Sequence, residues 1–335
     1  MISKVYEEIK TIIKENYKFF IILLLTFIIC SIELPYYIEA PGGIINVEDR
    51  VEVENGFKSS GSLNMAYVSE YKATIPTILI SKINKDWNLQ KRETDNINNT
   101  TEADYFRNHL LLEEANQNAI EIAYKTAGLD YKKENTKLYI TYIYENANTD
   151  LEIKDQITKI NNNIVKSKED IQKNISTTSK NEIINITVLR DNKELTRTAQ
   201  LVEYNNKLIL GIVITEKCDI KTTPELTFNF NESESGPSGG LMMTLAIYNA
   251  LTETDITKGR KIVGTGTINN NGEVGEIDGV KYKLKAAIKE KADIFLVPKG
   301  NNSKEAQNIA KKENYKIQIV PVGTFKEALD YLKTN

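Results

Sequence analysis

The chain has 335 residues, more than one ordinary hydrophobic core supports, so we expect at least two folded domains. Charged residues make up 27% and hydrophobic residues 41% of the chain, and the formal net charge of -3 gives no electrostatic reason to expect nucleic acid as a partner. With two cysteines and one histidine, the sequence supports neither a disulfide framework nor a metal site of several histidines or thiolates, and we expect no metal and no cofactor.

A mostly apolar segment over residues 19–38 lies near the N-terminus and ends in aromatic residues typical of a membrane interface. Lysines precede this segment and glutamates follow it, so the positive-inside rule places the N-terminus in the cytoplasm. We therefore expect a cytoplasmic tail over residues 1–18 and a single-pass transmembrane anchor over residues 19–38. A buried core helix and a cleaved signal peptide are the alternatives, although Pro41 follows the nearest small residue and disfavours cleavage there.

Extended backbone and one long helix are expected after the anchor. Residues 62–68 alternate like a half-buried strand, and the Asn- and Thr-rich residues 89–104 predict a loop. Apolar spacing predicts a helix over residues 105–127, with Gly128 as its stop. His109 falls at the start of this helix, where a surface histidine without chemistry is the simpler interpretation.

A β-rich segment follows. Strands are predicted over residues 138–143 and 183–189, and a helix over residues 168–175. Between them, the turn, aspartate and asparagine of residues 151–161 resemble the bacterial PDZ signature. The resemblance implies a PDZ-like domain over residues 131–204 that adds an extended peptide to a sheet edge. No glycine-rich carboxylate-binding loop precedes Leu138, and Asn162 stands where glycine is usual, so a role as spacer or gate stays open.

The C-terminal part alternates between strands and helices, which indicates an α/β domain. Strands are predicted over residues 208–214, 226–230, 261–268, 273–277, 293–298 and 317–321, and helices after Gly279 and over residues 303–313 and 325–332. Asn271-Gly272 is typical of a hairpin turn between two of these strands.

The stretch Gly236-Pro237-Ser238-Gly239-Gly240 leads into a strongly apolar helical segment. Glycines let a substrate backbone approach, and the N-terminus of a helix offers unpaired N–H groups to a developing oxyanion. Ser238 is therefore the candidate nucleophile, with Gly236, Pro237 and Gly239 as its supporting backbone.

Histidine does not supply the base. An α/β-hydrolase needs a histidine after the serine, and none follows His109, which itself lies in a glutamate-rich helix unlike the chymotrypsin arrangement. A lysine whose pKa is lowered by burial is the remaining natural base. In the helix after Gly279 the apolar side is formed by Leu284, Ala287 and Ile288. On this phase Lys281 points nearest the apolar side and Lys283 and Lys285 further round, so Lys281 is predicted to be the base.

The serine stretch, together with Thr265-Gly266-Thr267-Ile268 and Gly279-Val280-Lys281-Tyr282-Lys283, resembles the proteolytic domain of the Lon protease family. The resemblance implies a serine–lysine dyad in which Ser238 is the nucleophile and Lys281 the general base. Thr265 occupies the place of a family threonine that can hydrogen-bond the lysine.

The whole layout resembles the membrane-anchored Lon-like PDZ proteases of Gram-positive bacteria. This resemblance implies an α/β (α+β) Lon-type proteolytic domain over residues 205–335, a first part of the same region with a linker helix over residues 39–130, and an inserted PDZ-like domain. It also favours ring-like self-assembly into a homo-oligomer.

The predicted function is that of a membrane-anchored serine endopeptidase whose catalytic domain is extracellular and whose substrates are exported peptides or unfolded segments. The sequence has no Gly-x-x-x-x-Gly-Lys-Ser/Thr loop, so the activity is expected to be independent of ATP. The alternatives are a non-catalytic membrane-tethered scaffold that binds peptides through the PDZ-like domain and a purely structural envelope protein.

Overall fold

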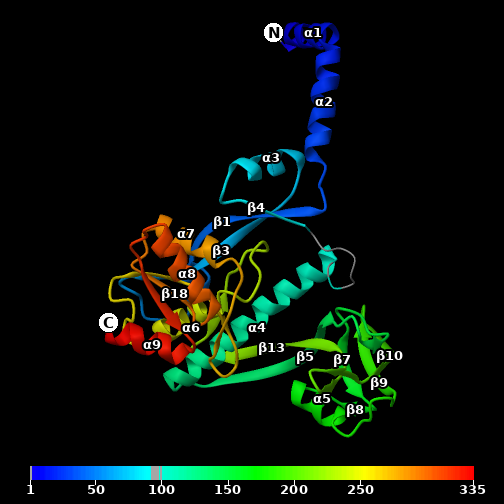
Figure 1. Cartoon of the computed structure of the whole chain (residues 1–335), viewed down its shortest axis with the longest axis vertical. Coiled ribbons are helices and arrows are strands. Elements are labelled where there is room, and N and C mark those ends of the chain that lie inside the picture. The colour runs from blue at the N-terminus through cyan, green and yellow to red at the C-terminus, as the bar shows by residue number, and fades with distance from the viewer. Residues whose placement is uncertain (1, 92–97, 99) are drawn as a thin grey trace. The chain divides into compact units, whose positions relative to one another are not determined.

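The structure is a computed structural model that describes residues 2–91, 98 and 100–335 (Figure 1). It divides into unit 1, Met1–Pro41 with Val68–Glu93, and unit 2, Gly42–Tyr67 with Thr94–Asn335. The helices are α1 (Ile2–Glu15), α2 (Tyr17–Ser31), α3 (Ile75–Ile83), α4 (Thr101–Ala127), α5 (Lys168–Ile175), α6 (Gly240–Leu251), α7 (Val280–Lys289), α8 (Asn301–Lys312) and α9 (Phe325–Thr334), with a 3₁₀ turn η1 (Val47–Asp49).

The strands belong to two large sheets and three short pairs. They are β1 (Tyr36–Asn46), β2 (Val51–Val53), β3 (Ser62–Lys72), β4 (Asn88–Lys91), β5 (Tyr131–Ile143), β6 (Asn148–Thr149), β7 (Gln156–Ile160), β8 (Asn163–Ile164), β9 (Ile184–Arg190), β10 (Lys193–Gln200), β11 (Val202–Tyr204), β12 (Lys207–Ile209), β13 (Ile212–Thr222), β14 (Leu226–Phe228), β15 (Lys261–Gly264), β16 (Thr267–Ile268), β17 (Val274–Gly275), β18 (Ile294–Pro298) and β19 (Gln318–Val322).

Unit 1 contains α1, α2, α3 and β4, and in it β4 pairs antiparallel with the first residues of β1. The transmembrane helix predicted over residues 19–38 does not form as such, because α2 ends at Ser31 and β1 begins at Tyr36. The 15 residues of α2 rise about 22 Å, less than the roughly 30 Å of a bilayer's hydrocarbon core. Across the described residues, no helix is both long enough and apolar enough to cross a membrane.

The central sheet of unit 2 is covered by helices on both faces. Its strands run in the order β19-β18-β15-β3-β1, with parallel pairing from β19 to β3. Successive strand residues point to opposite faces, so Leu296 joins the core beneath α4, α6 and α9, whereas Phe295 joins the core beneath α7 and α8.

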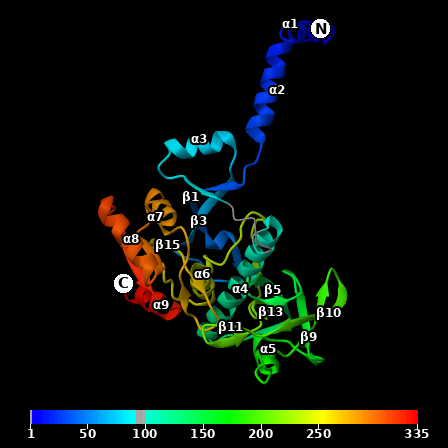
Figure 2. The same cartoon turned by 45° about the vertical axis from the view of Figure 1, so that its right-hand side comes forward.

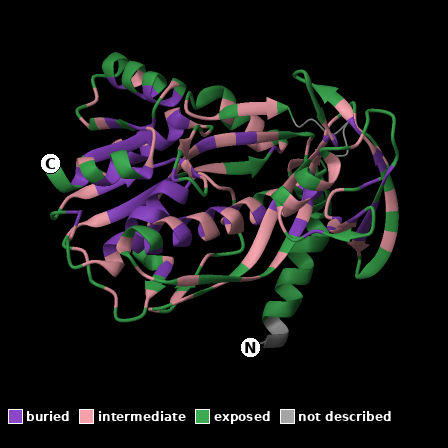
Figure 3. Cartoon of the chain, turned by 90° about the horizontal axis from the view of Figure 1, so that it is seen from below, coloured by how far each residue is buried: buried purple, intermediate pink, exposed green. Residues whose placement is uncertain are grey.

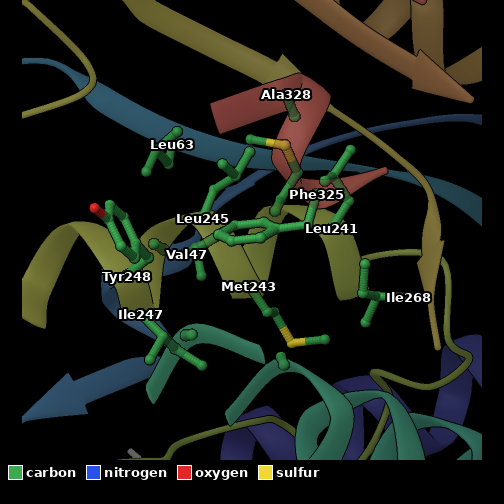
Figure 4. Packing of buried hydrophobic residues seen from close by; sticks show 14 of the residues in the cluster. Val47, Leu63, Leu241, Met243, Leu245, Ile247, Tyr248, Ile268, Phe325 and Ala328 are labelled. Carbon is green, nitrogen blue, oxygen red and sulfur yellow. The ribbon is translucent and has the colours of Figure 1, made fainter. Parts of the chain in front are cut away.

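The core around α6 shows this layering at close range, with Leu241, Leu245 and Tyr248 facing Phe325 of α9 (Figure 4). Figure 3 shows the buried residues gathered in α6 and the strands beside it. The result is a three-layer α/β arrangement, which confirms the mixed α/β class predicted from sequence.

The β-rich segment of unit 2 forms a second sheet, ordered β13-β5-β7-β9-β10-β6, with β8 paired to β7. It has its own apolar core, in which Leu138, Ile186 and Val188 pack with Ile171 of α5. The long antiparallel pair β5 and β13 leads from α4 to this segment (Figures 1 and 2). The turn between β7 and β8 holds Asn161 and Asn162 at φ 47° and 68°, so asparagine fills the left-handed positions that glycine often occupies.

Most of the predicted elements are confirmed, with four differences. The strand predicted over residues 261–268 is divided into β15 and β16, which belong to different sheets. The helix α4 begins at Thr101 because the Thr100 side chain accepts from the Ala103 amide and caps it. The strand predicted over residues 208–214 is interrupted by Gly211, whose φ of 72° ends the extended backbone. The loop predicted over residues 89–104 contains the end of β4 and the start of α4, and its residues 92–97 and 99 lie outside the described part of the chain.

Candidate active site

The backbone of Ser238 is fixed against the end of β15. Its carbonyl oxygen accepts from the Gly266 amide at 2.8 Å and from the Thr265 hydroxyl at 3.1 Å. The Leu241 amide in turn donates to the Gly266 carbonyl at 3.1 Å. Thr265 is fully buried and Ser238 is half-exposed, so a well-anchored peptide presents a serine that is accessible from solvent.

Two glycines near Ser238 occupy positions where a side chain would be strained or would clash. Gly236 adopts φ 87°, a left-handed conformation that other residues rarely adopt. At Gly240 a Cβ would lie 3.1 Å from the backbone nitrogen of Ile268, so a side chain there would push the start of α6 away from β16. Both glycines therefore hold the turn that precedes α6.

The backbone N–H groups near Ser238 differ in whether they have a hydrogen-bond acceptor within the protein. The Gly236 amide donates to the Asn108 carbonyl of α4 at 2.9 Å, so this N–H is already engaged, and the supporting role predicted for Gly236 stays a prediction. For the amides of Ser238 and Gly239, the described residues provide no backbone acceptor. These two N–H groups at the N-terminus of α6 are the donors that could stabilise negative charge on a substrate oxygen.

The two lysines at the start of α7 have different surroundings. Lys283 is 4% exposed, whereas Lys281 is half-exposed, with its Nζ 5.4 Å from the ring centroid of Tyr282. Burial lowers the pKa of Lys283 from 10.5 to about 8, although the negative charge of Asp278 acts in the opposite direction. Lys283 is the one lysine of the described residues that is both buried and shifted in this direction.

The helix phase that favoured Lys281 as the most desolvated lysine is therefore wrong. The inward stripe of α7 runs through Val280, Lys283, Leu284 and Ala287, at the i, i+3, i+4, i+7 spacing of a buried helix face. Counting Val280 as part of the apolar face would have placed Lys283 on this stripe. Because the predicted apolar face included Ile288 and left out Val280, its centre was rotated toward Lys281.

Chain topology brings Ser238 and Lys283 to the same edge of the sheet. A helix that connects parallel strands runs antiparallel to them, so its N-terminus lies near their carboxyl ends. The helix α6 leads into β15 and α7 leads from β15 toward its parallel neighbour β18. Ser238 lies two residues before the start of α6, and Lys283 is the fourth residue of α7, so both lie at the edge where β15 ends and Thr265 follows.

An ion pair fixes the loop that precedes Ser238. The Arg50 guanidinium donates to both carboxylate oxygens of Glu234, at 2.7 Å from Nη2 to Oε1 and 2.8 Å from Nε to Oε2, and both side chains are less than one fifth exposed. Burial opposes ionisation of Glu234, but the hydrogen bonds from Arg50 and Asn231 outweigh it and hold its pKa below the usual range. The loop is thus tied to Arg50, which directly follows η1.

His109 takes no part in this site. Its Nδ1 lies 2.8 Å from the Tyr105 carbonyl oxygen and its Nε2 3.0 Å from the Glu232 carbonyl oxygen. Each ring nitrogen lies beside a backbone carbonyl, which accepts only from a nitrogen that carries a proton. This arrangement gives His109 a structural role between α4 and the loop that precedes Ser238, residues 231–237, here called the serine loop.

Residues 231–334 match the sequence model of the Lon protease (S16) C-terminal proteolytic domain, and residues 127–201 match that of the PDZ domain. The Lon protease of Neorickettsia sennetsu is 34% identical over 99 residues, which cover 30% of this chain and 12% of that protein. The Lon protease of Desulfatibacillum aliphaticivorans is 27% identical over 159 residues, which cover 44% of this chain and 19% of that protein.

The chain thus spans less than a fifth of the length of these curated relatives. The matches confirm the predicted Lon-type proteolytic domain and the predicted PDZ domain, and they support a serine peptidase.

The Arg50–Glu234 pair predicts a measurable loss of stability when it is broken. In Arg50→Ala the Glu234 carboxylate stays mostly buried without its main donor, so the free energy of unfolding should fall by about 1.5–3 kcal/mol, measured by urea denaturation. Lys72→Ala is the control, because the Lys72–Glu33 pair is more than half exposed and should contribute no more than about 1 kcal/mol. Equal losses in both variants would contradict the assigned role of Arg50.

Proposed function

We propose that the protein is a serine endopeptidase that cleaves exported peptides or unfolded protein segments through a dyad of Ser238 and Lys283, without ATP. The observation that carries the proposal is the burial of Lys283, with its lowered pKa, at the sheet edge where the Ser238 peptide is anchored. The match of residues 231–334 to a Lon-type proteolytic domain supports the same reaction. The PDZ domain supports binding of peptide or protein segments.

The proposed reaction is acyl transfer. Neutral Lys283 takes the proton of the Ser238 hydroxyl, whose oxygen attacks the peptide carbonyl carbon. The amides of Ser238 and Gly239 donate to the oxyanion of the tetrahedral intermediate, and protonated Lys283 then gives its proton to the leaving amine. Water attacks the acyl-enzyme, with Lys283 again as base, and releases the new carboxyl end. The hydrogen bond predicted between Thr265 and the lysine stays a prediction; its hydroxyl proton goes to the Ser238 carbonyl.

Substitution of the two lysines distinguishes the proposed base from its neighbour. Lys283→Met, which keeps length and removes the base, should lower kcat/KM for an unstructured peptide by about 10²–10⁴-fold, and Ser238→Ala should abolish cleavage. Lys281→Met should retain wild-type activity, because that side chain is half-exposed and its charge is solvated. Thermal unfolding checks that each variant is folded. Full activity of Lys283→Met, or loss of activity only in Lys281→Met, would show that the base is misassigned.

The lowered pKa of Lys283 predicts how activity depends on pH. The lysine acts as a base only when neutral, so kcat/KM should rise by about tenfold per pH unit below pH 8 and level off above it. The measurement is the pH profile of kcat/KM for a peptide without ionisable side chains. A profile that is flat from pH 6 to 9 would exclude a lysine with this pKa as the base.

We propose further that α2 attaches the protein to the cell membrane. No residue of α2 is buried, and Phe19, Ile22 and Phe27 are each more than 60% exposed. A contiguous exposed apolar surface of this kind typically marks a site of interaction with a membrane or another protein. The orientation predicted from the flanking charges, with the N-terminus in the cytoplasm, stays a prediction.

Membrane attachment predicts that the full chain sediments with membranes from lysed cells. The double variant Ile22→Glu/Phe27→Glu should shift to the supernatant, because carboxylates on α2 oppose entry into lipid. Ile183→Glu/Leu208→Glu is the matched control, since these residues are exposed and lie outside α2. Recovery of the wild-type chain in the supernatant would refute the attachment.

A further inference from the structure

The short helix α3 of unit 1 presents an apolar face to solvent. Leu79 and Ile83 are 57% and 85% exposed, Ile75 and Ile80 are each more than 40% exposed, and no residue of α3 is buried. Ile75, Leu79 and Ile83 follow the i, i+4, i+8 spacing of one side of a helix, and Ile80 lies at the edge of that side. Exposed apolar residues that are contiguous, unlike those scattered singly, mark a surface that another molecule or a membrane covers.

The start of α3 is bonded to the segment that directly follows α2. The Leu34 amide donates to the Ala73 carbonyl at 2.8 Å, and the Ala73 amide donates to the Tyr36 carbonyl at 3.0 Å. The ion pair of Lys72 with Glu33, at 2.8 Å, joins the same two segments. The two helices lie close together at this end of α2 (Figures 1 and 2). A membrane entered by α2 would therefore meet α3 at its surface.

The hydroxyl groups of α3 are bonded within the helix and its cap. The Thr77 hydroxyl donates to the Thr74 carbonyl at 3.0 Å and accepts from the Thr74 amide at 2.7 Å. The Ser81 hydroxyl donates to the Ile78 carbonyl at 2.8 Å. Lys82 is the remaining polar side chain of α3, and it lies exposed in the last turn. Because the hydroxyl groups already have partners, little hydrogen bonding is lost when lipid replaces water around this helix.

Residues typical of a membrane interface follow the helix. Trp87 stacks on Tyr71, with ring centroids 5.8 Å apart and planes inclined at 22°. The Trp87 amide donates to the Asn84 carbonyl at 3.1 Å, which holds the tryptophan close to the C-terminal end of α3. Lys82 and Lys85, in the last turn and just after it, are exposed. Tryptophan and tyrosine are enriched at the level of lipid headgroups, and a lysine can extend its ammonium group to the phosphates from there.

We propose that α3 lies in the lipid–water interface of the membrane that α2 enters, with Leu79 and Ile83 against the acyl chains and Trp87 at the level of the headgroups. Nine residues rise about 14 Å, so α3 is too short to span the bilayer and would lie along its surface. The inference rests on the proposed attachment through α2, because the end of α2 brings α3 to the lipid. A second contact fixes the rotation of unit 1 about α2, which a single helix leaves free.

Trp87 makes the depth of α3 measurable, because the chain has no other tryptophan. The full-length protein is reconstituted in vesicles of phosphatidylcholine and phosphatidylglycerol, and flotation in a density gradient reports whether it is attached. Lipids brominated near the headgroups should quench most of the Trp87 fluorescence. Lipids brominated at the ends of the acyl chains should quench much less, because an interfacial helix enters the boundary between headgroups and acyl chains by only about 5–10 Å.

The double variant Leu79→Glu/Ile83→Glu places two carboxylates on the proposed lipid face. The quenching should be lost and the emission should shift to longer wavelength as Trp87 enters water, whereas flotation should persist because α2 is unchanged. Ile183→Glu/Leu208→Glu is the matched control, since these exposed residues lie in unit 2, and it should leave the quenching as in the wild type. Circular dichroism checks the fold, and the single variant Ile83→Glu should show a smaller loss of quenching.

Failure of the inference and failure of the attachment give different results. Protein that floats with the vesicles while Trp87 is not quenched, or quenching that persists in Leu79→Glu/Ile83→Glu, would overturn the inference and leave the attachment through α2 in place. Wild-type protein that does not float would refute the attachment and the inference with it. If the double variant lowers the oligomeric mass in detergent, measured by light scattering, while the quenching stays unchanged, the face is a contact between copies of the chain and the inference is wrong.

Discussion

The hydrogen bonds from Thr265 and Gly266 to the Ser238 carbonyl are the contacts on which the site depends. They tie the turn before α6 to the two residues that directly follow β15, and β15 lies in the middle of the parallel strands. Because Thr265 is fully buried, its hydroxyl needs this acceptor, and the acceptor exists only while the serine turn is in place. The packing of the sheet core and the position of Ser238, the proposed nucleophile, are therefore coupled through one carbonyl group.

Burial of Lys283 sets a second constraint. A fall in its pKa from 10.5 to about 8 corresponds to on the order of 3 kcal/mol by which the fold disfavours the charged form. The apolar stripe of α7 causes this effect, since Val280, Leu284 and Ala287 hold the lysine against the sheet. Asp278, one residue before Gly279, acts in the opposite direction and partly compensates for the desolvation. The helix α7 thus supplies the desolvation that the proposed lysine base needs, and Asp278, two residues before the helix, supplies the charge that limits it.

Local patterns in the sequence were sufficient to predict most of α4 and the helices of the C-terminal part, because caps, glycines and apolar spacing act within a few residues. The PDZ domain was predicted from a family resemblance, and α1 and α3 were not predicted. Local patterns were not sufficient to predict which lysine, Lys281 or Lys283, is buried. Burial of either lysine depends on which side of α7 faces the sheet. Tyr282 and Ala286 are buried as well, so the buried face of α7 is too wide for residue spacing alone to show which lysine lies on it. The Arg50–Glu234 pair joins residues 184 positions apart, and no local signal marks either partner.

The helix α4 connects features that the sequence leaves separate. Its Asn108 and His109 contact the serine loop, its Glu113 pairs with β13, and its Glu114 pairs with Lys168 at the start of α5 in the PDZ domain. A shift of α5 would therefore act on the face of α4 one helical turn or two from the residues that position Gly236. Charged contacts that are partly exposed are individually weak, about 1 kcal/mol or less each, so they can be exchanged at little cost. The bond from Gly236 to Asn108 joins two backbone groups, so this one contact with α4 does not depend on the side chain at position 108.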